Sequence, residues 1–327
     1  MNYRGKKVLV TGAAGFIGSH LVEALLENNA DVTAFIHYNS RNHWGNVEHL
    51  RKYENFSVIS GNIEDFLFVK NAITDKDIIF HLAALIGIPY SYSAPESYIR
   101  TNIIGTYNIL QAAQESDIER VIHTSTSEVY GTAEYTPIDE KHPIKGQSPY
   151  SATKIGADKL AEAFYCSFNL PVAIIRPFNA YGPRQSARAI IPSIISQAII
   201  NRTIKLGSLS PIRDFTFVKD TVAGFLKMGN SNAAIGKIIN IGNGKGITIR
   251  NLAEMIIEII DPDIQLQSDD SRVRPEQSEV KALICNNSLA KRTLNWEPQT
   301  SLSSGINSTI NWMEQNIEHY KADSYIV

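Results

Sequence analysis

Two side chains with complementary acid–base chemistry lie four residues apart in the sequence. Tyr150 and Lys154 form a Tyr-x-x-x-Lys motif at the start of a segment with helical periodicity, residues 150–168. This spacing places both side chains on one face of a helix, where an ammonium group beside a phenol favours the phenolate and lowers the pKa of the tyrosine. Such a tyrosine can accept a proton from a substrate hydroxyl group. The same motif also occurs on solvated helix faces, so its interpretation depends on its neighbours.

A polar segment upstream strengthens this interpretation. The sequence Ser125-Thr126-Ser127-Glu128-Val129-Tyr130-Gly131 follows the apolar run 121–124. Parallel sheets bind ligands at the carboxyl ends of their strands, so we expect Thr126, Ser127 and Glu128 to join Tyr150 and Lys154 as catalytic residues. The alternative for Glu128 is an exposed or helix-capping carboxylate.

A glycine-rich turn near the beginning of the sequence predicts a dinucleotide site. Thr11-Gly12-Ala13-Ala14-Gly15-Phe16-Ile17-Gly18 connects a short apolar strand, residues 8–10, to a helix over residues 16–27. Gly12 permits the tight turn, Gly15 lets the backbone approach a pyrophosphate, and Gly18 allows close packing of helix and strand. The free amides at the start of the helix then hold the anion. In this strand–turn–helix context the motif favours NAD or NADP over a turn without a ligand.

The end of the second predicted strand, residues 32–36, bears on the choice between these cofactors. A carboxylate there selects NAD by binding the ribose hydroxyls, and this sequence has none. Arg41, helped by His37 and Ser40, could accommodate the 2′-phosphate of NADP, so we expect a slight preference for NADP. The alternative is that Arg41 is a surface arginine with no cofactor contact.

The order of predicted elements indicates the fold that positions these residues. Strand-like and helical segments alternate through the first half, which predicts an α/β fold with a Rossmann-like, doubly wound parallel sheet. The strands are expected at residues 8–10, 32–36, 57–60, 78–81, 121–124 and 172–176, and helices at 98–115 and 150–168. We expect a dinucleotide-binding domain over residues 1–178, with a returning segment at about 215–245. Residues 179–327 would form mainly a smaller, substrate-binding lobe.

Composition excludes several other classes of protein. The 327 residues are 43% hydrophobic, which is ample for a large core. With 31 basic and 33 acidic residues the net charge is −2, so nothing in the charge favours nucleic acid or an anionic membrane as a partner. Cys166 and Cys285 lack the spacing of a zinc site, and no metal site is expected. The absence of an apolar run of about 18 residues and the few cysteines fit a cytoplasmic protein.

Taken in order, the motifs resemble those of extended short-chain dehydrogenase/reductases that act on nucleotide sugars. Besides the segments above, this resemblance is carried by the following motifs: His81-Leu82-Ala83-Ala84, Asn102-x-x-Gly105-Thr106, Arg176-Pro177-Phe178-Asn179, Arg213-Asp214-Phe215 and Leu294-Asn295-Trp296-Glu297-Pro298. The Thr126-Ser127-Glu128 form is similar to that of GDP-mannose 4,6-dehydratases and UDP-glucuronate decarboxylases. The stretch 83–95 and the run 148–154 favour a dehydratase, and the chain as a whole resembles the N-acetylglucosamine-nucleotide 4,6-dehydratases of legionaminic acid synthesis.

This resemblance implies ligand contacts and an assembly. The implied cofactor-binding residues are Gly12, Ala14, Gly15, Phe16, Ile17, Gly18, His37, Ser40, Arg41, Asn62, Ile63, Leu82, Ala83, Ala84, Thr124, Tyr150 and Lys154. The implied substrate-binding residues are Asn179, Arg188, Arg213 and Arg274, with Arg184 near the nucleotide base. Asp65 would lie near the adenine, or else in a solvated loop. The helices at 98–115 and 150–168 would pair in a homodimer.

The resemblance also implies a reaction on a UDP- or GDP-linked hexose. Tyr150 would act as base while C4 is oxidised by NAD(P), which is then regenerated, and Glu128 would remove the C5 proton before water leaves from C6. Related enzymes with Thr-Asp-Glu have an acid where this sequence has Ser127, a poor acid, so the donor to the leaving hydroxyl stays open. A decarboxylase or a 4-epimerase is the alternative on the same fold. A cofactor-binding protein without activity is disfavoured, because Tyr150, Lys154 and Glu128 are all present.

Overall fold

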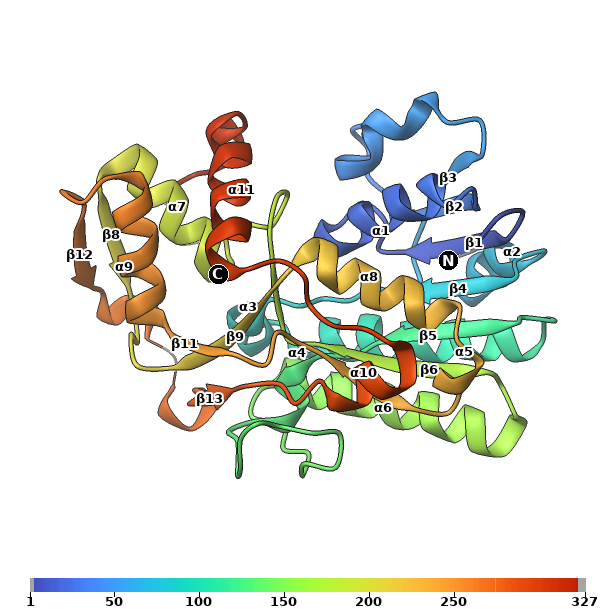
Figure 1. Ribbon diagram of the computed structural model, residues 1–327. Helices are drawn as coiled ribbons and strands as arrows, with labels where there is room; N and C mark the ends of the chain where they lie inside the picture. Colours follow the sequence, from blue (N-terminus) through green and yellow to red (C-terminus); the bar gives the residue numbers. More distant parts are fainter. Residues whose placement is uncertain (1–2, 274, 323–327) are drawn as a thin grey trace.

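The parallel strands predicted in the first half form one sheet. The computed structural model describes residues 3–273 and 275–322 (Figure 1). Seven strands lie in the order β10-β6-β5-β4-β1-β2-β3, and every neighbouring pair is parallel. They are β1 (Lys7–Thr11), β2 (Asp31–His37), β3 (Phe56–Gly61), β4 (Ile78–His81), β5 (Arg120–Thr124), β6 (Val172–Pro177) and β10 (Ile238–Ile241). This confirms the predicted Rossmann-like, doubly wound sheet.

Helices cover both faces of this sheet, as the buried, apolar strands require. In Figure 1, α1 (Phe16–Glu27) and α8 (Val218–Gly229) pack together on one face, and α5 (Gly105–Gln114) and α6 (Pro149–Phe168) pack together on the other. The short helix α2 (Phe66–Ile73) lies against α5. Two apolar clusters fill the two sides: one joins α1 and α8 to the sheet, and the other joins α2, α5 and α6 to it.

Segments from the second half form a smaller body at the left of Figure 1. Its strands are β7 (Asn179–Tyr181), β8 (Thr203–Leu206), β9 (Ile212–Phe217), β11 (Gly246–Thr248), β12 (Gln265–Ser268) and β13 (Ala282–Leu283). Strand β9 pairs with β7, β11 and β13, while β8 pairs with β12. The helices α7 (Ile190–Asn201), α9 (Ile249–Ile260) and α11 (Leu302–Glu314) share a separate apolar cluster with β7, β8, β9, β11 and β12. The boundary at residue 178 stays a prediction. After this residue the chain returns to the larger body, where β10 is a strand of the large sheet and α8 and α10 (Ser288–Leu294) pack on that sheet.

The segment expected to form one helix over residues 98–115 is interrupted. It consists of α4 (Pro95–Tyr98), a π-helical turn η2 (Ile99–Ile104) and α5. Asn102, in the π-helical turn, is buried; its side chain accepts a hydrogen bond from the backbone amide of Leu85 (2.8 Å) and donates to the carbonyl oxygen of Leu85 (3.0 Å). Such distortions occur often at functional sites, and this one ties the helix to the loop after β4.

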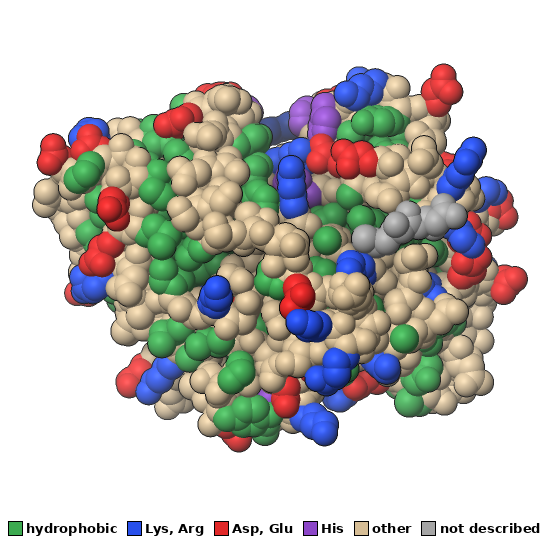
Figure 2. Space-filling model, viewed as in Figure 1, with side chains coloured by type: hydrophobic (Ala, Val, Ile, Leu, Met, Phe, Trp, Pro, Cys, Tyr) green, Lys and Arg blue, Asp and Glu red, His purple; other side chains and the backbone are tan. Residues whose placement is uncertain are grey.

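The visible surface shows charges of both signs. In Figure 2, Lys and Arg side chains are interspersed with Asp and Glu, and the upper edge is notched between the larger and smaller bodies. Among the described residues, no helix has the length and apolar character needed to span a membrane.

Candidate active site

The two residues of the Tyr-x-x-x-Lys motif lie buried in the first turns of α6. Ser148 and Ser151 form a reciprocal capping box at the start of this helix, and Pro149 occupies its first turn, so the local sequence fixes where α6 begins. Tyr150 and Lys154 are 7% and 4% exposed, which excludes the solvated helix face. The Lys154 ammonium donates to the carbonyl oxygen of Thr124 (2.6 Å), which ties α6 to the carboxyl end of β5.

The segment after β5 reaches the same place. Ser127–Tyr130 forms a 3₁₀ turn (η3), and the hydroxyl oxygen of Thr126 accepts a hydrogen bond from the Glu128 amide (3.2 Å). The Thr126 side chain hydrogen-bonds to the Tyr150 hydroxyl, and the Glu128 carboxylate is close enough to act on that phenol electrostatically. Glu128 is half-buried, and Ser127 is buried. The structure therefore brings Thr126, Glu128, Tyr150 and Lys154 together.

Burial dominates the electrostatics of these groups. It raises the pKa of Tyr150, and the negative charges of Glu128 and Asp158 raise it further, whereas the hydrogen bond from Thr126 lowers it. Burial also lowers the pKa of Lys154 to about 8, against the opposing charge of Asp158. The expectation that Lys154 lowers the pKa of Tyr150 in the protein alone is therefore wrong, because Lys154 donates to Thr124 and desolvation of the phenol is the larger effect.

The glycine turn has the geometry that a pyrophosphate requires. Gly12 has φ +67°, and a Cβ there would lie 2.8 Å from the Ala83 amide nitrogen. A Cβ on Gly18 would lie 2.2 Å from the Gly12 carbonyl oxygen, so α1 packs closely on the turn. No side chain caps the start of α1, and Gly15 is exposed with Ala14, Phe16 and Ile17 partly exposed. These amides fit the anionic centre of NAD or NADP.

Two buried polar atoms at the sheet edge have no partner among the described residues. They are the Thr124 hydroxyl and the side-chain oxygen of Asn179, both at residues predicted to bind ligands. Such atoms are costly when unpaired, so they fit a polar ligand lying across the ends of β5 and β6. Leu82, Ala83 and Ala84 leave β4 at the same edge; the Leu82 and Ala83 amides donate to Thr11 (each 3.1 Å).

The other predicted cofactor contacts lie in loops after β2 and β3. His37, Ser40 and Arg41 are all exposed after β2, and nothing in this arrangement decides between NAD and NADP. Asn62 is exposed, and Ile63 is buried against Gly105. Asp65 caps α2 by accepting a hydrogen bond from the Phe68 amide (3.1 Å), which gives this carboxylate a structural role. His81 is buried between Thr11 (2.8 Å) and Thr106 (3.0 Å), as expected for a packed strand-end histidine.

The arginines expected to bind substrate have different surroundings. Arg213 is 7% exposed and pairs with Glu279 (3.2 Å). Arg188 is exposed, and its Nη1 lies 3.5 Å from the position of a Cβ on Gly87, close to Tyr98. Arg184 donates to Ser19 and Glu23 on α1, so its side chain is directed to the dinucleotide half; its place near the nucleotide base stays a prediction. Arg274 lies outside the described residues.

Comparison with known proteins places this arrangement in a family. A family model described as GDP-mannose 4,6 dehydratase matches residues 9–309. The chain is 30% identical to human dTDP-D-glucose 4,6-dehydratase over 97% of this chain and 92% of that protein. It is 32% identical to UDP-glucuronate 4-epimerase from Thermodesulfobacterium geofontis, over 96% and 98%. DesIV, a dTDP-glucose 4,6-dehydratase from Streptomyces venezuelae solved with NAD and TYD bound, superposes with TM-score 0.87, 28% identity and coverage of 96% and 99%.

The chain belongs to the GDP-mannose 4,6-dehydratase family. This confirms the resemblance to extended short-chain dehydrogenase/reductases acting on nucleotide sugars. Because similar proteins include both dehydratases and epimerases, membership in the GDP-mannose 4,6-dehydratase family does not select one reaction.

Sequence reasoning missed several residues at this site. Asn46 donates to the carbonyl oxygen of Ala14 (3.0 Å), and Gly45 packs on Ala14, so the loop after β2 folds back onto the glycine turn. Tyr98 packs edge-on against Tyr150 with ring centroids 6.2 Å apart. Asp158, one helical turn beyond Lys154, is fully buried. The i, i+4 spacing of Lys154 and Asp158 is the one signal in the sequence that could have identified it.

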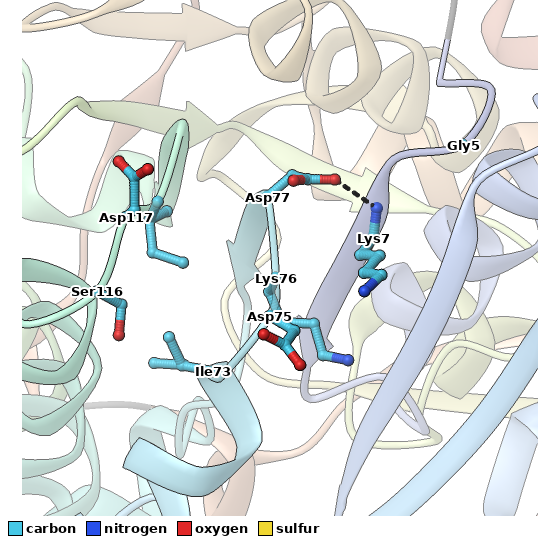
Figure 3. Close-up of a pocket in the computed structure, with 9 residues that line it drawn as sticks. Gly5, Lys7, Ile73, Asp75, Lys76, Asp77, Ser116 and Asp117 are labelled. Carbon is cyan, nitrogen blue, oxygen red and sulfur yellow. Dashed lines mark hydrogen bonds between the residues drawn. The ribbon is translucent and has the colours of Figure 1, made fainter.

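The opposite edge of the large sheet also carries a hollow, which Figure 3 shows. It is lined by Gly5, Lys7, Ile73, Asp75, Lys76, Asp77, Ser116, Asp117 and Ile118. The Lys7 amide donates to Asp77 there (2.8 Å). These residues lie at the amino ends of strands β1, β4 and β5. Doubly wound proteins bind their ligands at the carboxyl ends of the strands, so this hollow is not the candidate active site. Among the described residues, no group of three or more His, Cys, Asp or Glu side chains could hold a metal ion.

Proposed function

We propose that this protein is a nucleotide-sugar 4,6-dehydratase that uses NAD(P) and converts a UDP- or GDP-linked N-acetylglucosamine, or a related hexose, to its 4-keto-6-deoxy form. The observation that carries the proposal is the convergence of Thr126 and Glu128 on the buried Tyr150 phenol. A dehydration of this kind needs one base at the C4 hydroxyl and a second at the adjacent carbon. Tyr150 and Glu128 supply this pair.

Three residues act on C4. Held at the glycine turn and by Lys154, NAD(P) would supply the hydride acceptor for C4 and the hydride donor for C6. Tyr150 accepts the proton of the C4 hydroxyl, and Thr126 donates a hydrogen bond to the same oxygen. The Lys154 ammonium, which donates to the Thr124 carbonyl oxygen (2.6 Å), would bind the nicotinamide ribose and so hold the cofactor beside C4.

Glu128 acts on C5 and C6. The ketone at C4 acidifies the C5 hydrogen, and the Glu128 carboxylate takes it as a proton, leaving an enolate. The C6 hydroxyl then leaves as water after receiving a proton. We assign this proton transfer to Glu128 itself, which carries the proton just taken from C5, because a serine hydroxyl such as that of Ser127 is a poor acid. Hydride addition at C6 again gives an enolate, which takes up one proton at C5, while Tyr150 releases the proton that it took from the C4 hydroxyl; the net change is the loss of one water.

The narrower substrate proposal rests on sequence resemblance. The chain as a whole resembles the N-acetylglucosamine-nucleotide 4,6-dehydratases of legionaminic acid synthesis. We also propose that the protein works in the cytoplasm, prefers NADP slightly through Arg41, and forms a homodimer. Exposed apolar side chains at Ile104, Tyr107 and Phe168, on the two helical segments expected to pair, support a dimer. A light-scattering mass of 36.3 kDa, that of one chain, would contradict it.

The test is product analysis with a panel of sugar nucleotides. The purified protein is incubated with UDP- and GDP-N-acetylglucosamine, each with NAD and with NADP, and products are weighed by mass spectrometry. Dehydration gives a product lighter by one water. Glu128→Gln should lower this turnover by about 10³-fold or more while cofactor binding is retained. Glu162→Gln, on α6 and away from Tyr150, is the matched control. Unchanged turnover in Glu128→Gln would remove the assigned base.

One observation favours a second candidate function. Arg188 lies beside Gly87 and Tyr98, and Tyr98 packs on Tyr150. A cation at this place could pair with the C6 carboxylate of a uronic acid, as a decarboxylase or a uronate 4-epimerase would need. The same panel therefore includes UDP-glucuronate. Conversion of this compound with loss of CO₂, or to its 4-epimer, without water loss from N-acetylglucosamine nucleotides, would select the second candidate.

A further inference from the structure

A fully buried carboxylate lies below the two motif residues of α6. Asp158 follows Lys154 by one helical turn and Tyr150 by two, so all three lie along one face of the helix. Its Oδ1 atom contacts the His123 ring (3.2 Å), and its Oδ2 atom accepts hydrogen bonds from the Ser125 hydroxyl (2.7 Å) and from Arg176 (2.8 Å). Asp158 therefore holds the end of β5, immediately before Thr126.

Arg176 carries the network to the other end of the same segment. This side chain is also fully buried, and its Nη1 donates to the Tyr130 hydroxyl (3.0 Å) while its Cζ lies 5.0 Å from the Tyr130 ring centroid. The Tyr130 hydroxyl donates in turn to Asn240 in β10 (2.8 Å). Thr126, Ser127 and Glu128 thus lie between two points, Ser125 and Tyr130, that are both tied to Asp158.

We propose that Asp158 is a positioning residue, which fixes the segment carrying Thr126 and Glu128 relative to the helix that carries Tyr150 and Lys154. The inference rests on the proposed function insofar as those four residues are catalytic. Its physical basis is that neither α6 nor η3 alone sets the distance between the two bases. A displacement of about 1 Å between reacting groups can reduce turnover by about 10²-fold.

Asp158 also acts electrostatically on Lys154 and Tyr150. The groups facing Lys154 are Tyr150 and Asp158 from α6, His81 from β4 and His123 from β5. Burial lowers the pKa values of both histidines, so they are neutral near pH 7. The Asp158 carboxylate raises the pKa values of both Lys154 and Tyr150. It remains ionised, because contacts with His123, Arg176 and Ser125 outweigh burial and lower its own pKa to about 2.

If Asp158 had a purely structural role, its substitution would have a different effect on activity. A buried ion pair is weak evidence for stability, and its loss would lower the melting temperature and reduce activity by the same factor at every pH. A positioning and electrostatic role shifts the pH dependence as well. Without the Asp158 charge, the pKa of Lys154 falls further, so the limb of the pH–rate profile at which Lys154 loses its proton moves to lower pH.

The experiment compares two substitutions at residue 158. Asp158→Asn removes the charge at nearly constant size; we expect kcat to fall by about 10²-fold, KM to change little, and the pH optimum to move down by about one unit. Asp158→Glu keeps the charge but displaces it, so kcat should fall while the pH optimum stays. The control is Asp220→Asn, a buried carboxylate in α8 that accepts from the Thr300 amide (2.9 Å). A uniform loss of activity in Asp158→Asn, with an unmoved optimum, would overturn the inference.

The role of Asp158 can also be tested through the residues that it contacts and through the pKa of Lys154. If Asp158→Asn does not fold, Ser125→Ala and Tyr130→Phe each remove one anchor of the segment; both should lower kcat, and unchanged rates would contradict the proposal. An NMR titration of the Lys154 side chain needs no turnover, and its pKa should fall in Asp158→Asn. If the wild-type protein epimerises or decarboxylates without losing water, the proposed dehydratase function fails, whereas the shift of the optimum in that reaction still tests Asp158.

Discussion

Lys154, which we propose to be catalytic, is unfavourable for folding. Burial lowers its pKa to about 8, whereas an exposed or unfolded lysine titrates near 10.4. Below pH 8 both states carry the charge, and the folded state bears the cost of burying it. Between about pH 8 and 10.4 the unfolded chain binds the proton that the folded chain has lost, so stability rises with pH in this window.

Lys154→Met should therefore abolish turnover and yet stabilise the fold. We expect the free energy of unfolding at pH 7 to increase by about 2 kcal/mol, less than the pKa shift alone implies, because the Thr124 carbonyl loses its donor. The difference between variant and wild type should shrink as the pH rises to 10. Denaturant unfolding at several pH values measures it, with Lys237→Met as a control. A variant that is less stable than the wild type at pH 7 would show that burying the Lys154 charge costs less than its lowered pKa implies.

Among single residues, the candidate catalytic residues are easier to recognise in the sequence than the residues that surround them. Tyr150, Lys154 and Glu128 are recognisable because motif and strand end coincide. The roles of Asp158 and Tyr98 and the raised pKa of Tyr150 could not be predicted from the sequence. They depend on how α6 packs against β5 and on how much water that packing excludes.

At the scale of elements, the strands of the large sheet and the helix after the glycine turn are more predictable than the short strands of the smaller body. Helix α1 and strand β4 have the expected bounds. The π-helical turn η2 interrupts a segment with ordinary helical spacing, because Asn102 bonds to the loop after β4, a tertiary contact that the periodicity does not contain. Strands of two to four residues, such as β13 and β8, are defined by their partners in space rather than by their own pattern.

Asp214 in β9 shows how such short elements are held together. Its Oδ1 accepts from the Asn243 amide (2.9 Å), and its Oδ2 accepts from the amides of Gly244 (2.7 Å) and Cys285 (3.0 Å). Burial raises its pKa to about 6 despite these three donors. One carboxylate therefore joins β9 to the segments that follow β10 and β13.

We expect Asp214→Asn to destabilise the protein by about 2–4 kcal/mol, because the new amide group would place its own N–H donors against backbone donors. Thermal unfolding measures the effect. Asp263→Asn, in an exposed loop, should leave the melting temperature unchanged. If Asp214→Asn melts with the wild type, the carboxylate is not the link that this geometry implies.

For the whole molecule, the sequence predicts the large sheet but not how the smaller body meets it. The crossing contacts are made by side chains far apart in the sequence, which no local pattern relates. Arg184 follows β7 yet donates to Ser19 (3.2 Å) and Glu23 (2.7 Å) on α1, and the His20 ring contacts the Pro183 carbonyl oxygen (3.0 Å). The loop after β7 thus lies on α1, the helix that begins at the glycine turn.

These contacts should help the protein retain its cofactor between turnovers, which a dehydratase needs because hydride removed from C4 must return to C6 of the same sugar. The Arg184–Glu23 pair is mostly buried, so its loss should weaken NAD(P) binding by about tenfold, equivalent to about 1.4 kcal/mol. Burial lowers the pKa of His20 to about 4, so the ring stays neutral and cofactor retention should not vary between pH 6 and 8.

Arg184→Ala tests the role of the Arg184–Glu23 pair by the amount of cofactor left after dialysis. Arg202→Ala, which removes an exposed ion pair with Asp261, should retain cofactor like the wild type. Equal retention in both variants would mean that the loop rests on α1 without holding the cofactor.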